Sequence, residues 1–140
     1  SPEEYHQRLW QGVVAQYLVI DAGERVLGLV ACYQCDFVSG TAFLSAIRFG
    51  DQPNVNVGFI RGCLMFVSRL FNDFPLRKLY LESAESNSSL FGGGRSLLLT
   101  EEARFRERVW LNGQFEDLIV HSVSRDAWQS SRLSKYRPAP

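Results

Sequence analysis

Two cysteines of this 140-residue chain lie at a spacing that can serve metal binding. Cys32-Tyr-Gln-Cys35 has the C-x-x-C pattern of zinc sites, and the remaining cysteine is Cys63. The motif falls in residues 26–34, a run rich in Val, Leu and Tyr that predicts a β-strand. Side chains three apart on a strand point to opposite faces, so without a turn the two sulfurs do not converge. No second C-x-x-C or Cys/His pair completes a site, and we predict buried, unreactive thiols and no metal.

Two further features invite a chemical interpretation. Gly92-Gly-Gly-Arg95 has the glycines of a phosphate-binding loop but lacks the Gly-Lys-Ser/Thr ending, which favours a lid or a linker. His121 lies on a predicted strand, where its imidazole could titrate near neutral pH and act as a base, or simply pack against its neighbours. The sequence leaves both alternatives for His121 open.

The composition predicts one folded domain and excludes several classes of protein. With 46% hydrophobic and 13% aromatic residues, a chain of this length buries roughly two thirds of its unfolded surface. Fifteen basic and fifteen acidic residues cancel, so no global positive field exists to hold nucleic acid or an anionic membrane. No apolar run approaches the roughly 20 residues that span a bilayer, and the sequence opens without a signal-like pattern. We expect a cytoplasmic protein without nucleic-acid or membrane partners.

The hydrophobic pattern of the first half predicts a short helix followed by a three-stranded meander. The helix is expected over residues 2–12, and the strands over 17–20, 26–32 and 42–49. Asp21-Ala-Gly-Glu-Arg25 has the length of a hairpin connection between the first two strands. Apolar residues then recur at helical spacing from Phe59 to Phe71, which predicts one long helix that ends at Asn72-Asp-Phe-Pro75.

The second half predicts a parallel strand and a final hairpin. Residues 77–82 are a β-rich run that, after the helical crossover, should lie parallel to the 42–49 strand. Residues 103–111 alternate, Asn112-Gly113 is a strong hairpin-turn dipeptide, and residues 115–123 return as a strand. The expected fold class is α+β, a mixed central sheet flanked by helices, in a single domain over residues 1–128. Residues 129–140 are expected to form a flexible tail.

This order of elements resembles the GNAT (GCN5-related N-acetyltransferase) superfamily, and more narrowly the branch that modifies the N-termini of ribosomal proteins. The resemblance covers roughly residues 10–128 and is carried by four stretches: Arg77-Lys-Leu-Tyr-Leu-Glu82, Asn87, residues 103–113, and residues 117–128, which end in Arg-x-x-Trp. It implies an acyl-CoA N-acyltransferase fold whose two middle strands splay to admit the pantetheine arm. It also implies transfer of an acetyl or other acyl group from coenzyme A to an amine, with acetyl-CoA as co-substrate.

The resemblance assigns a set of residues to the cofactor. A turn over residues 57–62, at the start of the long helix, would hold the pyrophosphate through its N–H groups, and the 42–49 strand would polarise the thioester. The cofactor-binding residues so implied are Ile47, Phe49, Val57, Gly58, Phe59, Ile60, Arg61, Gly62 and Asn87. The chain departs from the family's basic-x-x-Gly-x-Gly/Ala signature, because Val57 and Phe59 stand where small residues are usual. A helix N-terminus still offers N–H donors to an anion.

Acyl transfer also needs a base, because an alkyl ammonium with a pKa of about 10 is protonated at neutral pH. The candidate catalytic residues are Glu82 and Glu85, at and just beyond the end of the 77–82 strand, where such sheets open into a cleft. Asp51 lies on the loop expected to face the cofactor. The alternative for Glu82 is an exposed strand-end charge opposite Arg77 or Lys78. The acid that the family places seven residues after Asn87 is a Tyr, and this chain has Gly94 there.

Asp117 admits two interpretations. On a buried face it would need a basic partner across the hairpin, for which Arg104, Arg106 and Arg108 are available, and it would then be structural. Otherwise it lines the substrate cleft. Trp110, Trp128 and most of the ten Phe residues are expected in the core.

A second hypothesis is a catalytically silent module of the same fold that binds a protein partner or a ligand. The missing small residues favour it, and so do the roughly sixteen residues before Tyr17, where the family usually has a further strand and most of a helix. A sheet edge left open there would favour a homodimer. The acceptor amine and the acyl chain length are not determined by the sequence.

Overall fold

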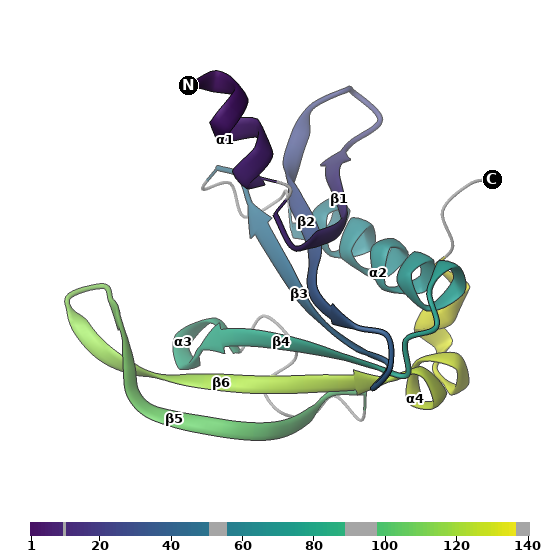
Figure 1. Ribbon diagram of the computed structural model, residues 1–140. Helices are drawn as coiled ribbons and strands as arrows, with labels where there is room; N and C mark the ends of the chain where they lie inside the picture. The colour runs from purple at the N-terminus through teal and green to yellow at the C-terminus, as the bar shows by residue number, and fades with distance from the viewer. Residues whose placement is uncertain (10, 51–55, 89–97, 137–140) are drawn as a thin grey trace.

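A single mixed sheet of six strands organises the chain, with helices against one of its faces (Figure 1). The structure is a computed structural model and describes residues 1–9, 11–50, 56–88 and 98–136. In chain order, its elements are α1 (Pro2–Leu9), β1 (Val13–Ile20), β2 (Val26–Asp36), β3 (Thr41–Arg48), α2 (Asn56–Asp73), β4 (Lys78–Ala84), α3 (Glu85–Ser88), β5 (Thr100–Leu111), β6 (Gln114–Ser124), α4 (Arg125–Ser130) and η3 (Arg132–Lys135). The strand order is β1-β2-β3-β4-β6-β5.

The pairing confirms the predicted topology. β1, β2 and β3 form an antiparallel meander, β3 and β4 are parallel, and β6 is antiparallel to both β4 and β5. Asn112 and Gly113 both have positive φ, 51° and 80°, as the two central residues of the predicted hairpin turn require. The α+β class with a mixed central sheet is therefore confirmed.

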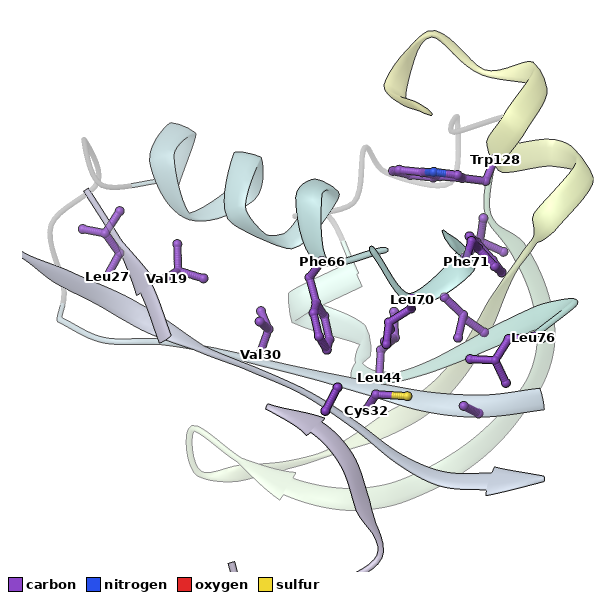
Figure 2. Packing of buried hydrophobic residues seen from close by; sticks show 14 residues of the cluster. Val19, Leu27, Val30, Cys32, Leu44, Phe66, Leu70, Phe71, Leu76 and Trp128 are labelled. Carbon is purple, nitrogen blue, oxygen red and sulfur yellow. The ribbon is translucent and has the colours of Figure 1, made fainter. Parts of the chain in front are cut away.

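The hydrophobic core lies between the sheet and α2 (Figure 2). The apolar face of α2 that the helical spacing predicted includes Phe66, Leu70 and Phe71, which are buried in the core and at most 6% exposed. Val30 and Leu44 meet them from β2 and β3. Because burying one such side chain contributes roughly 1.5–3 kcal/mol, this apolar face does more to fix α2 than helix propensity does.

Glycines let the first half of α2 approach the sheet closely. A Cβ on Gly28 would lie 2.3 Å from the carbonyl oxygen of Ile47 and 2.5 Å from the ring of Phe59. A Cβ on Gly62 would lie 2.4 Å from Val19, so α2 rests on the sheet through a position that tolerates no side chain. A Cβ on Gly58 would lie 2.9 Å from the side chain of Leu27, so this position also faces the sheet.

The Arg-x-x-Trp ending of the hairpin ties α2 to the sheet. The guanidinium of Arg125 donates to the carbonyls of Phe71, Phe74 and Leu76, at and just after the C-terminus of α2. The indole of Trp128 is 3% exposed, and its Nε1 donates to Ser68 Oγ of α2 at 3.2 Å. In this chain both residues of the motif therefore have structural partners.

Residues 130–136 differ from the flexible tail that the sequence predicted. α4 runs to Ser130, η3 follows, and Leu133 packs against the core. The Arg61 guanidinium lies 5.7 Å from the centre of the Tyr136 ring, which links the segment to α2. Hydrogen bonds from polar side chains to the backbone stabilise this turn. For example, Ser131 Oγ donates to Trp128 O at 2.7 Å. Residues 137–140 lie outside the described part of the chain.

The prediction that Cys32 and Cys35 point apart is wrong. Gln34 has φ 48°, and the β2–β3 register shifts between Tyr33 and Asp36, so a β-bulge interrupts the strand. The bulge changes the direction in which the side chains after it point, so Cys32 and Cys35 face the same side. Their Sγ atoms lie 3.6 Å apart. Within the described residues, no group of three or more His, Cys, Asp or Glu side chains could hold a metal ion.

The two edges of the sheet differ in character. β1 is one edge, and its sequence VVAQYLVI carries no charge. β5 is the other, and its sequence TEEARFRERVWL alternates acidic and basic residues, which protects an edge from pairing with other chains. At the tip of that hairpin Trp110 is 64% exposed, against the prediction that it lies in the core; its ring stacks edge-on to Phe115. No helix among the described residues has the length and apolar character needed to cross a membrane.

Candidate functional site

The parallel strands at the centre of the sheet separate part-way along their length. β3 and β4 are paired from Thr41 with Lys78 to Leu44 with Leu81, and beyond that pair the strands diverge (Figure 1). β3 stays with β2 as far as Arg48, and β4 stays with β6 as far as Ala84. We call the opening between residues 45–47 and 82–84 the wedge. Strand edges that face such an opening present N–H and C=O groups to whatever enters it.

The first turn of α2 lies at the open end of the wedge. Phe59 contacts Gly28, and Gly28 is paired with Arg48, the last residue of β3. The first four N–H groups of an α-helix have no acceptor within the helix and carry a partial positive charge, so Asn56, Val57, Gly58 and Phe59 direct donors beyond its end. The side chain of Val57 is 79% exposed and leaves this turn open to solvent.

The face of β4 that carries the core brings one unpartnered hydroxyl to the wedge. Leu79 and Leu81 lie on the α2 side of the sheet, and alternation places Ser83 on the same side, two residues beyond the last β3–β4 pair. The Oγ of Ser83 is buried and has no hydrogen-bond partner among the described residues. A buried hydroxyl without a partner is costly, so this atom is suited to a bound group. Nothing in the sequence marks Ser83, because only the divergence of two strands distinguishes it from any strand serine.

The opposite face of the sheet carries an aromatic row next to a carboxylate. The rings of Tyr33, Phe43 and Tyr80 follow one another across β2, β3 and β4, with centroids 5.9 and 5.3 Å apart. Glu82 follows Tyr80 on this face, and no hydrogen bond or ion pair joins its exposed carboxylate to another described residue. Burial raises the pKa of Tyr33, and the negative charge of Glu82 raises it further. Arg77 and Lys78, the expected partners of Glu82, instead contact Ser39 O at 2.7 Å and Glu102 Oε1 at 2.6 Å.

Glu85 stands in a different environment from Glu82. Its carboxylate accepts from Arg104 Nη1 at 2.8 Å, and the same nitrogen contacts Asp117 Oδ2 at 3.3 Å. Asp117 Oδ1 accepts the backbone N–H of Glu107, which has φ 50° at a bulge of β5. That N–H and the Arg104 guanidinium hold the pKa of Asp117 below its ordinary value. The arrangement supports the structural interpretation of Asp117, with Arg104 as the partner among the three arginines.

The other predicted cofactor residues fall into distinct positions. The residues from Val57 to Gly62 form part of the helix α2 rather than the expected turn, so the N–H groups of Ile60, Arg61 and Gly62 lie inside its hydrogen-bonded ladder. The N–H of Phe49 donates to Leu27 O at 2.8 Å, so it is engaged within the sheet. The side chain of Ile47 is 52% exposed.

Three features stand apart from these contacts. Asn87 is exposed in α3, just beyond the wedge. His121 lies opposite Leu81 on β6, partly buried, on the core side of the sheet. Asp51 and the glycine-rich stretch 92–95 lie outside the described residues.

Of three comparisons with known proteins, only the one with solved structures found matches, and these concern the fold. No protein-family model matches the sequence, and no curated protein sequence does. Among solved structures, a chimera of Vibrio cholerae spermidine N-acetyltransferase SpeG and hSSAT superposes with a TM-score of 0.74 at 20% identity, over 92% of this chain and 80% of that one. The V. cholerae spermidine N-acetyltransferase in complex with CoA and spermine gives a TM-score of 0.69 at 20% identity, over 92% and 76% of the two chains.

The chain has the acyl-CoA N-acyltransferase fold of the GNAT type. The structures named above are spermidine N-acetyltransferases, and the narrower resemblance to the ribosomal-protein branch stays a prediction. At 20% identity this likeness is one of fold.

Proposed function

We propose that this protein is a CoA-dependent N-acyltransferase that acts on an amine. The observation that carries the proposal is the wedge between β3 and β4, with the first turn of α2 at its open end. On the opposite face lies the Glu82 carboxylate, which has no ion-pair partner in the part of the chain that the structure describes. Acyl-CoA is a long, thin ligand, with the thioester at one end of its pantetheine arm and an anionic diphosphate at the other. The diverging edges offer it backbone donors and acceptors, and the helix N-terminus offers donors to its diphosphate.

The residues present fit such a ligand on both sides of the sheet. On the α2 side, Asn56, Val57, Gly58 and Phe59 supply the N–H groups for the diphosphate, and the Ser83 hydroxyl hydrogen-bonds the arm where it passes between the strands. Edge N–H groups of residues 45–47 polarise the thioester carbonyl, as oxyanion donors do in acyl transfer. CoA supplies the activated acyl group; the protein holds it in line with the acceptor.

On the other face, Glu82 is placed to serve the acceptor. Its carboxylate takes a proton from the entering ammonium, and the freed amine nitrogen attacks the carbonyl carbon. The C–S bond breaks as the C–N bond forms, and the surplus proton on the nitrogen passes to the departing thiolate, which leaves as the free thiol of CoA. The aromatic row of Tyr33, Phe43 and Tyr80 forms a wall against which an alkyl amine can lie, since cations and aromatic faces attract. Between the two predicted bases, the contact of Glu85 with Arg104 favours Glu82.

Calorimetric titration with acetyl-CoA tests the binding half of the proposal. Wild-type protein should bind in the micromolar range. Val57→Asp places a carboxylate on the exposed first turn of α2, where it suits the helix but repels a diphosphate. Two unit charges about 6 Å apart repel by roughly 1 to 3 kcal/mol at effective dielectric constants of about 20 to 40, so the Kd should rise about tenfold or more.

A matched control makes this test specific. Val38→Asp introduces the same charge at a fully exposed valine of the β2–β3 turn and should leave the Kd unchanged. If wild-type protein shows neither heat nor a thermal shift with millimolar acetyl-CoA, the silent-module hypothesis replaces the enzyme.

Ser83→Ala separates a ligand contact from a packing role. Removing a buried, unpartnered hydroxyl should stabilise the free protein, by up to about 1 kcal/mol, while it weakens acetyl-CoA binding. A rise in Tm with an unchanged Kd would show that Ser83 does not touch the ligand.

The catalytic half is tested with a panel of amines that includes spermine and spermidine, the substrates named for the structural neighbours. Glu82→Gln should lower kcat by about 10² to 10⁴ without changing the acetyl-CoA affinity. Glu85→Gln should change kcat by no more than a few-fold. The reverse order would assign the base to Glu85.

A further inference from the structure

The bulge in β2 brings the thiols of two cysteines next to each other. Cys32 and Cys35 place their Sγ atoms 3.6 Å apart, close to van der Waals contact. Gln34 holds the chain in the left-handed region, at φ 48°, and the register with β3 breaks between Tyr33 and Asp36. A regular strand would have turned one sulfur into the core and the other away from it.

The two sulfurs differ in their access to solvent. Cys32 is 0% exposed and lies in the core layer beneath α2, near Leu44 (Figure 2). Cys35 is partly buried and packs at the margin of the same core. Burial, reinforced by the neighbouring Cys35 thiol, raises the pKa of Cys32 to about 12, so the buried sulfur is a poor first nucleophile. A reagent in solution therefore meets Cys35 first.

We propose that Cys32 and Cys35 form a dithiol modification site, which closes to an intrachain disulfide by exchange with a low-molecular-weight disulfide such as glutathione disulfide. Closure requires the two sulfurs to approach from 3.6 Å to about 2.05 Å, a movement that side-chain rotation can supply. With two thiols and no third His, Cys, Asp or Glu ligand among the described residues, the pair fits a disulfide better than a tetrahedral metal.

The exchange proceeds in two balanced steps. The Cys35 thiolate attacks one sulfur of glutathione disulfide, which forms a mixed disulfide and releases one glutathione. The Cys32 sulfur then loses its proton and attacks the Cys35 sulfur, which releases the second glutathione. The protein loses two S–H bonds and gains one S–S bond, and one glutathione disulfide is reduced to two glutathiones. The high pKa of Cys32 makes the second step slow at neutral pH and faster as the pH rises.

The disulfide would close a ring around Tyr33 and Gln34. The Tyr33 ring contacts Phe43, and Phe43 contacts Tyr80 beside the wedge. Oxidation at the bulge therefore constrains the first member of the aromatic row, although the disulfide itself does not depend on the function proposed for that face.

The test uses the Cys63→Ser protein, in which only the pair remains. After equilibration with glutathione disulfide, acid quenching, unfolding and alkylation with iodoacetamide, intact mass should show a loss of two hydrogens and no alkyl group. In the same background, Cys32→Ser should retain one glutathione on Cys35, because no second thiol displaces it. Cys35→Ser should remain unmodified while folded, because Cys32 is buried.

Two results would overturn the proposal. One is a pair that stays fully alkylatable after exposure both to glutathione disulfide and to diamide, a smaller oxidant that takes up the two hydrogens as a hydrazine. The other is a stable mixed disulfide at Cys35 with Cys32 still free. Peptide mapping of the oxidised wild-type protein reads the linkage without any substitution, so a folding defect in one variant does not decide the outcome.

Discussion

The contacts of Arg125 predict a large loss of stability on its replacement by methionine, which keeps the length of the apolar stem. The guanidinium donates to Leu76 O and Phe74 O at 2.7 Å each and to Phe71 O, and it lies 5.3 Å from the centre of the Phe71 ring. Phe71 lies in the last turn of α2, whose carbonyls have no partner within the helix, whereas Phe74 O keeps the N–H of Leu76 at 2.8 Å. The substitution leaves the vacated acceptor positions to whatever water reaches a partly buried site.

The magnitude follows from these contacts. A hydrogen bond to a charged group contributes about 1.5 to 3 kcal/mol. Because the site is only partly buried and water can replace part of each bond, we take about 1.2 kcal/mol for each of the three, plus about 0.5 kcal/mol for the ring contact. The sum is about 4 kcal/mol. An unfolding entropy of about 2.1 cal/mol/K per residue gives roughly 0.3 kcal/mol/K for this chain, so Tm should fall by about 13 °C.

Urea titration and thermal melts followed by circular dichroism measure this change. Arg132→Met removes an exposed arginine of the neighbouring η3 helix and should shift stability by less than about 0.5 kcal/mol. Arg125→Lys keeps the charge but not the planar fork and should lie between the wild type and the methionine variant. A loss below about 1 kcal/mol for Arg125→Met would refute the assignment of Arg125 as the clamp between α2 and the sheet.

Three further perturbations test the packing and the electrostatics. Gly62→Ala should cost about 1 to 3 kcal/mol in urea unfolding because its Cβ has no room, whereas Gly23→Ala, whose Cβ meets only an ordinary contact, should cost little. Trp128→Phe should cost about 1 to 3 kcal/mol because the buried Ser68 hydroxyl loses its donor; equal stability would show that water replaces the indole. The pKa of Asp117 is lowered in the folded protein, so its contribution is present above the ordinary value of 3.8 and is lost as the pH falls through the lower folded value. In Asp117→Asn the free energy of unfolding should therefore fall less steeply as the pH is lowered through the acid range. An unchanged pH dependence would contradict this contact.

Most of the fold could be predicted from local pattern. Apolar residues from Phe59 to Phe71 recur at helical spacing, and the run before Asn112 and the run after Gly113 alternate, so the long helix and the final hairpin follow from periodicity and turn chemistry alone. The parallel pairing of β3 with β4 follows from the helix between them, because a crossover connection of this kind joins parallel strands.

The candidate site was predictable only in part. The sequence placed Glu82 at the end of the predicted 77–82 strand and Glu85 just beyond it. In the structure β4 extends to Ala84, so Glu82 lies within the strand. The sequence named both residues as candidate bases, and those roles stay predictions. It could not separate them, since Arg104 reaches Glu85 from a strand nineteen residues away, and the pairing of β5 with β6 decides that contact. Ser83 was missed for the same reason, because its lack of a partner exists only where β3 leaves β4.

The sequence by itself therefore determined the long helix, the six strands and the order in which they join, and the residue types that could do chemistry, but not the short helices near the C-terminus. These follow from hydrophobic period, turn dipeptides and charge, all of which act over a few neighbouring residues. Only the tertiary structure decided that the strand carrying Cys32 and Cys35 bulges so that its two sulfurs meet, and that glycines at 58 and 62 serve close packing. Those outcomes depend on which distant atoms lie within a few ångströms of each other, and a chain of residue letters does not specify those distances until the sheet has formed.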